Sequence, residues 1–156
     1  MEMYVGTKLV EAEPETYGTF HNAADAKEAN ELGYRVRYAD GYESWSPKAT
    51  FDAAYLRIVT NDKLKTNKPS ISQQMVDDFI AGHQVTTLGD KCTVVRALLR
   101  NGFEIVESSA CVSAENYDEK LGEEICMEKI KDKVWFLLGF LLQTGVNGID
   151  SVHFTA

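Results

Sequence analysis

The chain of 156 residues has few cysteines and histidines. Three cysteines stand at positions 92, 111 and 126, an odd number with wide gaps and no Cys-x-x-Cys pair. We therefore expect no disulfide framework and a reducing compartment. The histidines at positions 21, 83 and 153 are not spaced as metal ligands of one another or of a cysteine. We accordingly expect no metal site and no cofactor.

Basic residues are outnumbered, with 16 Lys and Arg against 24 Asp and Glu and a formal net charge of -8. A general nucleic-acid-binding surface needs clustered Lys and Arg, so nucleic-acid binding is the least favoured of the functions considered. The balance is typical of an acidic cytoplasmic protein. An alternative is an acidic face that binds a basic partner protein.

Long hydrophobic runs are also lacking. The longest, Val134 to Leu142, has nine residues, whereas a bilayer-spanning helix needs about 20. The N-terminus, MEMYVGTKLVEAE, contains acids and no apolar core, so we expect no signal peptide. These absences predict a protein that does not associate with membranes.

Recognisable catalytic motifs are missing too. The sequence contains no G-x-S-x-G, no P-loop and no G-x-G-x-x-G. Adjacent acids such as Asp77-Asp78 lie on expected helices as solvated faces. Cys111 precedes an expected helix, where a thiol pKa can be lowered, but its apolar neighbours favour a small core residue. We therefore expect no enzyme.

What is present predicts an α+β protein that begins with a small antiparallel sheet or barrel-like module and a helix, residues 1–59. Tyr4 to Ala12 alternates as a first strand, and residues 23–32 favour a helix. Tyr34 to Tyr38 and the segment reaching Trp45 flank Asp40-Gly41, a strong hairpin signal. Ser46-Pro47 then resembles the start of a helix.

A polar linker, residues 60–69, precedes a helix–β-hairpin–long-helix module at 70–143. Ser70 begins a capping box, and Gln84 to Leu88 is a possible edge strand. Cys92 to Leu99 predicts a strand buried on both faces, and Asn101-Gly102 predicts a type I′ turn. A return strand and a helix of roughly 25 residues follow, capped by Ser113 or Asn116. Residues 144–156 are expected to form a tail.

The long helix combines an apolar stripe with an end that is apolar all round. A helix surrounded by apolar side chains must be covered, and a second subunit is the economical cover. We therefore expect a dimer or higher oligomer. The expected stripe is Tyr117, Leu121, Ile125, Ile130, Val134, Leu137 or Leu138, and Leu141. The expected oligomer interface is Val134, Trp135, Leu138, Phe140, Leu141 and Leu142.

Candidate binding residues lie on the two hairpins. Arginine beside an aromatic ring can hold a nucleotide by charge and stacking. The alternative is a surface hairpin whose aromatic residues pack on the following helix. The candidates are Arg35, Arg37, Tyr42 and Trp45 on the first hairpin, and Arg96 and Arg100 on the second.

The C-terminal half resembles the phage protein family named after gene products forty-nine and sixty-six of two enterobacterial podoviruses. The resemblance lies in the segments NGF at 101–103, SACV at 109–112, NYDE at 116–119, KVW at 133–135 and LGFLL at 138–142, together with Gly122. The resemblance implies a phage protein acting in the bacterial cytoplasm. It implies no catalytic residue.

The N-terminal part, with DGYESWSPK at 40–48, is similar to a small phage and prophage module found fused to various C-terminal domains, including some associated with countering bacterial defence. The phage resemblance, the small acidic chain and the missing catalytic motifs together lead us to expect a non-enzymatic phage accessory protein that binds and inhibits a host protein, first of all one of defence. A sponge that sequesters a nucleotide immune messenger is the alternative. A nucleic-acid-associated phage protein is the second alternative.

Overall fold

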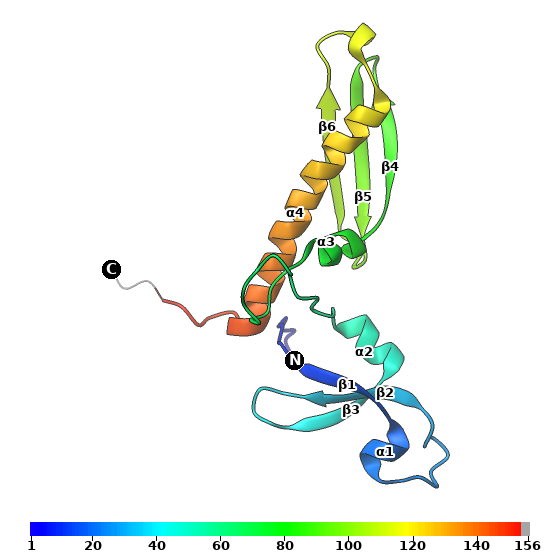
Figure 1. Ribbon diagram of the computed structural model, residues 1–156, viewed down its shortest axis with the longest axis vertical. Helices are drawn as coiled ribbons and strands as arrows, with labels where there is room; N and C mark the ends of the chain where they lie inside the picture. The colour runs from blue at the N-terminus through cyan, green and yellow to red at the C-terminus, as the bar shows by residue number, and fades with distance from the viewer. Residues whose placement is uncertain (154–156) are drawn as a thin grey trace. The chain divides into compact units, whose positions relative to one another are not determined.

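The computed structural model describes residues 1–153 and shows the expected α+β architecture (Figure 1). The chain divides into two compact units. The first comprises Met1–Arg57 together with residues from Gln143 onward, and the second is Ile58–Leu142. Each unit contains a three-stranded antiparallel sheet. Residues 154–156 of the expected tail lie outside the described residues.

The sheet of the first unit has the order β1-β2-β3. Val36 of β2 is buried. The Phe51 ring lies tilted against Tyr34 at a centroid distance of 4.4 Å and stacks on Tyr55 at 4.6 Å. Aromatic pairs of this kind add to the stabilisation from burial itself. The elements are β1 (Glu11–Thr16), α1 (Tyr17–His21), β2 (Leu32–Arg37), β3 (Glu43–Pro47) and α2 (Lys48–Ala54).

Two predictions for the first unit are wrong. The first strand is Glu11–Thr16 rather than Tyr4 to Ala12, and Pro14 lies inside it, because an edge strand tolerates a residue without an N–H. The expected helix at 23–32 is absent, since its alanines provide propensity without apolar anchors. A short helix forms instead at Tyr17–His21, where the Thr16 hydroxyl caps the N–H of Thr19 at 3.3 Å.

The start of α2 also differs from its prediction. Ser46 belongs to β3, Pro47 occupies the N-cap position, and no side chain caps the helix. Phe51, Tyr55 and Ile58 recur at the spacing of one helical face in the sequence, but the helix ends at Ala54, so they do not lie on one helix.

Both predicted hairpins form, and they share one loop geometry. Leu99 N donates to Phe103 O at 2.8 Å, Gly102 N donates to Leu99 O at 2.9 Å, and Gly102 has φ +85. Among the described residues only Asn22 is a non-glycine with positive φ, so Asn101 does not form the expected type I′ turn. The loop is instead a three-residue turn with glycine in the left-handed position, as it is at Gly41.

In the second unit, α4 lies across one face of a sheet with the order β4-β5-β6 (Figure 1). The helix continues to Asn147, beyond the expected end at Gln143. Its last residues belong to the first unit. The elements are α3 (Gln73–Phe79), β4 (Ile80–Leu88), β5 (Cys92–Leu99), β6 (Glu104–Ala110), the 3-10 helix η1 (Ala114–Asn116) and α4 (Glu119–Asn147).

The helix caps of this unit correct the predicted ones. Ser72, not Ser70, caps α3 by accepting the N–H of Met75 at 3.3 Å. The carboxylate of Asp118 accepts the N–H of Leu121 at 3.0 Å at the start of α4, in place of Ser113 or Asn116. The reason is the turn of 3-10 helix after Ser113, which delays the α-helix.

Strand β5 is buried on one face only, so the prediction of burial on both faces is wrong. Thr93, Val95, Ala97 and Leu99 are buried beneath α4, whereas Arg96 and Leu98 are exposed on the opposite face. The sheet therefore has one covered and one open face, as an antiparallel sheet can.

The buried residues of α4 recur at every fourth position, and they differ from the apolar stripe expected from the sequence. Leu121 and Ile125, expected in the core, are 54% and 37% exposed. The close approach of α4 to β5 explains the shift, because a side chain at position 122 would collide with Thr93. The buried residues are Gly122, Cys126, Ile130, Val134 and Leu138.

Candidate binding groove between β6 and α4

The candidate site begins at β6, which is an edge strand of its sheet. Alternate residues of an antiparallel strand direct their N–H and C=O groups to the same side. The bond between Leu99 N and Phe103 O shows that odd-numbered positions on this strand are directed to β5. Glu104 and Val106 therefore direct their N–H and C=O groups outward. Within residues 1–153, none of these groups has a hydrogen-bond partner.

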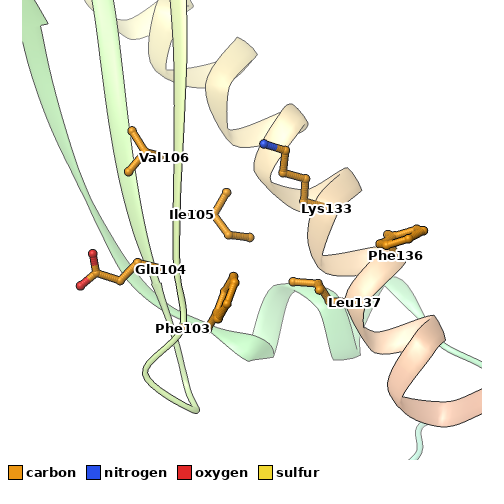
Figure 2. Close-up of a pocket in the computed structure, with 7 residues that line it drawn as sticks. All are labelled: Phe103, Glu104, Ile105, Val106, Lys133, Phe136 and Leu137. Atoms are coloured by element: carbon orange, nitrogen blue, oxygen red, sulfur yellow. The ribbon is translucent and has the colours of Figure 1, made fainter. Parts of the chain in front are cut away.

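One flank of α4 forms the second wall of the groove. Figure 2 shows Ile105 directed from β6 towards the helix, close to Leu137 and Lys133, with Phe136 on the outer side. Phe103 lies beside Leu137 at the hairpin end, while Glu104 and Val106 lie on the other side of the strand. The strand's edge and the helix flank thus enclose a hollow.

The hollow has a volume of about 330 Å³ and a mostly apolar lining. Its floor is Ile105, which is 6% exposed, while Phe103, Val106 and Phe136 are 56, 56 and 75% exposed. Large apolar side chains gathered around a concavity are typical of a binding site rather than of an ordinary surface. The groove can therefore take apolar side chains of a partner.

Charged groups close the groove at the end away from the hairpin turn. Lys133 on α4 pairs with Glu107, whose side chain is 16% exposed. Lys129, one turn earlier, donates to the backbone oxygen of Ser108 at 2.8 Å. Among residues 1–153, Lys129 has no carboxylate within ion-pair distance, so this end of the groove carries one more positive than negative charge in a chain of net charge -8.

The arginines predicted on the first hairpin lie on one face of their sheet and are held by acids. Arg35 binds both carboxylate oxygens of Glu15 at 2.8 and 3.0 Å. Arg37 donates to Glu43 at 2.9 Å. The hydrogen bond to Arg35 lowers the pKa of Glu15, and the same contact raises the pKa of Arg35. A nucleotide phosphate would have to compete with these carboxylates.

The predicted aromatic residues are separated from each other. Trp45 pairs with Arg35 across the strands and donates its indole N–H to Glu15 O at 2.9 Å. Tyr42 stacks on Tyr38 beyond the end of the strands, at 5.8 Å between ring centroids. Trp45 therefore lies beside Arg35, as predicted, whereas Tyr42 lies apart, against Tyr38.

On the second hairpin, Arg96 is bound on the open face of the sheet by Glu104, at 2.9 Å from Nε to Oε2, and by Gln84 at 3.1 Å. Arg100 is exposed at the hairpin turn, and its backbone N–H donates to Phe79 O. Neither lies on the side of β6 that faces α4.

The predicted oligomer interface divides into buried and exposed residues. Val134 and Leu138 belong to the core, with 0 and 2% exposure, so they are not available to a second subunit. Phe140 and Leu141 are 69 and 39% exposed. Trp135 and Leu142 are intermediate.

The groove itself was missed by the sequence prediction. Phe103 and Phe136 appear in the sequence as members of apolar runs, without any sign that they share a surface. One pattern in the sequence could have indicated the helix wall of the groove: Lys133, Phe136 and Phe140 are spaced so that they lie on the same side of the helix. Only the pairing of β6 with β5 places that flank beside a free strand edge.

Two further findings concern residues 1–153. No group of three or more His, Cys, Asp or Glu side chains among them is arranged to hold a metal ion. None of the helices in this range combines the length and the apolar character needed to cross a membrane.

Comparison with known proteins identifies the module that carries the groove. Residues 71–146 match the family model described as Phage protein (N4 Gp49/phage Sf6 gene 66) family. Searches of curated proteins and of solved structures found no significant match. The matched segment includes β6 and all but the last residue of α4. The chain is therefore a phage protein whose residues 71–146 belong to the Phage protein (N4 Gp49/phage Sf6 gene 66) family.

Proposed function

We propose that this phage protein is a non-enzymatic accessory protein that binds and inhibits a host protein through the groove between β6 and α4. The observation that carries the proposal is the groove itself, where a free strand edge adjoins exposed apolar side chains of a helix. Exposed aromatic residues grouped in this way are the usual anchors of protein–protein interfaces.

Two features of the structure favour a protein over a nucleotide as the partner. Arg35 and Arg37 are engaged by carboxylates, which supports an architectural role for them. The groove contains a single charged helix residue, Lys133, and otherwise apolar walls on the side of α4. The resemblance of residues 40–48 to a module associated with countering bacterial defence makes a defence protein the first partner to examine.

The test is affinity capture from lysates of bacterial hosts, with wild-type protein and two matched variants. Phe136→Asp places a charge in the groove, and Leu121→Asp places one on an exposed site of the same helix outside it. A central aromatic anchor contributes about 2 kcal/mol or more, which corresponds to roughly 30-fold in affinity.

We expect a host protein in a stoichiometric complex with the wild type and with Leu121→Asp, and a loss of about 30-fold with Phe136→Asp. The purified partner should lose its activity when the wild-type chain is added. Failure to capture any protein across hosts with different defence systems would contradict the proposal. Equal capture by Phe136→Asp would move the binding surface elsewhere.

A further inference from the structure

We infer that the groove receives its partner as an extended strand that adds to β6, and that it selects the pattern acidic–x–apolar. This inference rests on the proposed function, since it specifies how the groove holds a polypeptide. The juxtaposition behind it is a free strand edge, an apolar hollow beside that edge, and two lysines one turn apart at the end of the hollow.

The edge available for pairing is short and well defined. Glu104 and Val106 present an outward N–H and C=O each, so an added strand can form up to four backbone hydrogen bonds there. At Ser108 the next outward carbonyl is already occupied by the Lys129 ammonium at 2.8 Å. An unpaired edge is a ready template for another strand, and peptide recognition by strand addition uses this property.

The apolar position of the pattern follows from the alternation of side chains along strands. A partner residue opposite Ile105 directs its side chain to the same face of the sheet as Ile105, which is the face covered by α4. There it enters the hollow between Phe103, Phe136 and Leu137 (Figure 2). The 330 Å³ volume suits one large apolar side chain together with parts of its neighbours.

The acidic position follows from the excess of positive charge. A partner residue opposite Glu107 points to the same face and lies near two lysines: Lys133, which is paired with Glu107, and Lys129, whose ammonium donates to the backbone oxygen of Ser108 rather than to a carboxylate. A carboxylate at this position balances the two lysines. Since antiparallel pairing is the arrangement of the whole sheet and is slightly more stable per residue, the acid precedes the apolar residue by two positions.

The opposite edge of the sheet does not offer the same combination. On β4, His83 is bound to Glu123 at 2.6 Å, and Thr87 is bound to Tyr117 and Glu119 at 2.6 and 2.7 Å. These polar contacts occupy the space between that edge and α4. The pairing of β4 with β5 is also irregular between Ile80 and Gly82, which disturbs the edge.

The test is selection of a displayed library of random twelve-residue peptides on the full chain. The enriched peptides should share the pattern acidic–x–apolar, and exchanging the two positions should weaken binding at least about tenfold. Val106→Pro removes the outward N–H and should also weaken binding about tenfold. Val85→Pro removes an outward N–H from β4, the opposite edge of the sheet, and should bind as the wild type does.

Amide hydrogen exchange provides a second measurement that does not depend on the proline variant. A bound peptide should slow exchange at the N–H groups of Glu104 and Val106, and leave that of Val85 on the β4 edge unchanged. Enriched peptides without the pattern, or no added protection at Glu104 and Val106, would overturn the inference. Protection that rises with protein concentration alone would assign the edge to a second copy and overturn it as well.

These results separate the two proposals. A captured host protein that depends on Phe136 but binds Val106→Pro and Val85→Pro equally would preserve the proposed function and refute strand addition. Peptides that show the pattern and the protection would support strand addition even when a given lysate contains no partner.

Discussion

The replacement Gly122→Ala tests the packing on which the groove depends, because Gly122 sets how closely α4 approaches β5. A Cβ atom at position 122 would lie 2.1 Å from Thr93 Oγ1 and 2.7 Å from Thr93 Cβ. Real side chains do not approach this closely, so the helix or the strand must move. Thr93 is buried and its hydroxyl donates to Tyr117 at 3.2 Å, so it cannot turn aside without losing that bond.

The expected magnitude is the balance of two opposing effects. Inserting a methyl group into a filled core costs about 1–3 kcal/mol. Replacing glycine by alanine within a helix gains about 0.5–1 kcal/mol through backbone entropy. The difference between these terms spans about 0–2.5 kcal/mol, and from the middle of the two ranges we expect Gly122→Ala to lower the free energy of unfolding by about 1.3 kcal/mol.

Gly139→Ala is the matched control on the same helix. A Cβ atom there meets nothing within 4 Å, so only the helix-propensity term remains and the variant should be more stable by about 0.5–1 kcal/mol. The assay is urea unfolding followed by circular dichroism at the helix band, since α4 has 29 residues and the other α-helices five or seven each. Combining Gly122→Ala with Thr93→Ala should recover part of the loss, because two of the three crowding atoms are removed. Equal stabilisation by Gly122→Ala and Gly139→Ala would refute the close approach.

Three further predictions concern pH, thiols and assembly. The pKa of Asp77 is lowered by its hydrogen bond to Lys131, so its stabilising effect is present at neutral pH and is lost as pH falls through the folded pKa. The unfolding midpoint should decline below about pH 5, and less steeply in Asp77→Asn. Burial raises the pKa of the Cys126 thiol, so iodoacetamide should leave Cys126 unmodified in the folded protein and label it after unfolding. Sedimentation equilibrium should show a dimer or higher oligomer that Phe140→Asp reduces to a monomer, and a monomer at all concentrations in the wild type would contradict self-association.

Local signals were sufficient where one short segment decides the conformation. Cys92–Leu99 was predicted as a strand with the bounds it has, because β-branched residues run between two turn signals. Asp40-Gly41 and Asn101-Gly102 located both hairpins. The long helix was predicted from its apolar stripe and its apolar end. These features depend on neighbours in the chain.

Predictions failed where a distant contact decides. Residues 23–32 have helix-favouring alanines, but without apolar anchors they form turns bound to α1, with Gly18 N donating to Ala29 O at 2.9 Å. Leu121 and Ile125 looked like core residues, yet the contact of Gly122 with Thr93 rotates them to the surface. Arg35 looked available for a ligand until the register placed Glu15 beside it.

The sequence by itself determined the class of the fold and the segments that mark the phage family. It also determined the succession of strands and long helix along the C-terminal half of the chain. These properties follow from periodicity, turn chemistry and local composition, which are all written within a few residues of each other. The tertiary structure alone decided the groove. Its walls come from β6 and α4, and which side chains meet there depends on strand register and on the helix rotation fixed by Gly122, two quantities that no local pattern contains.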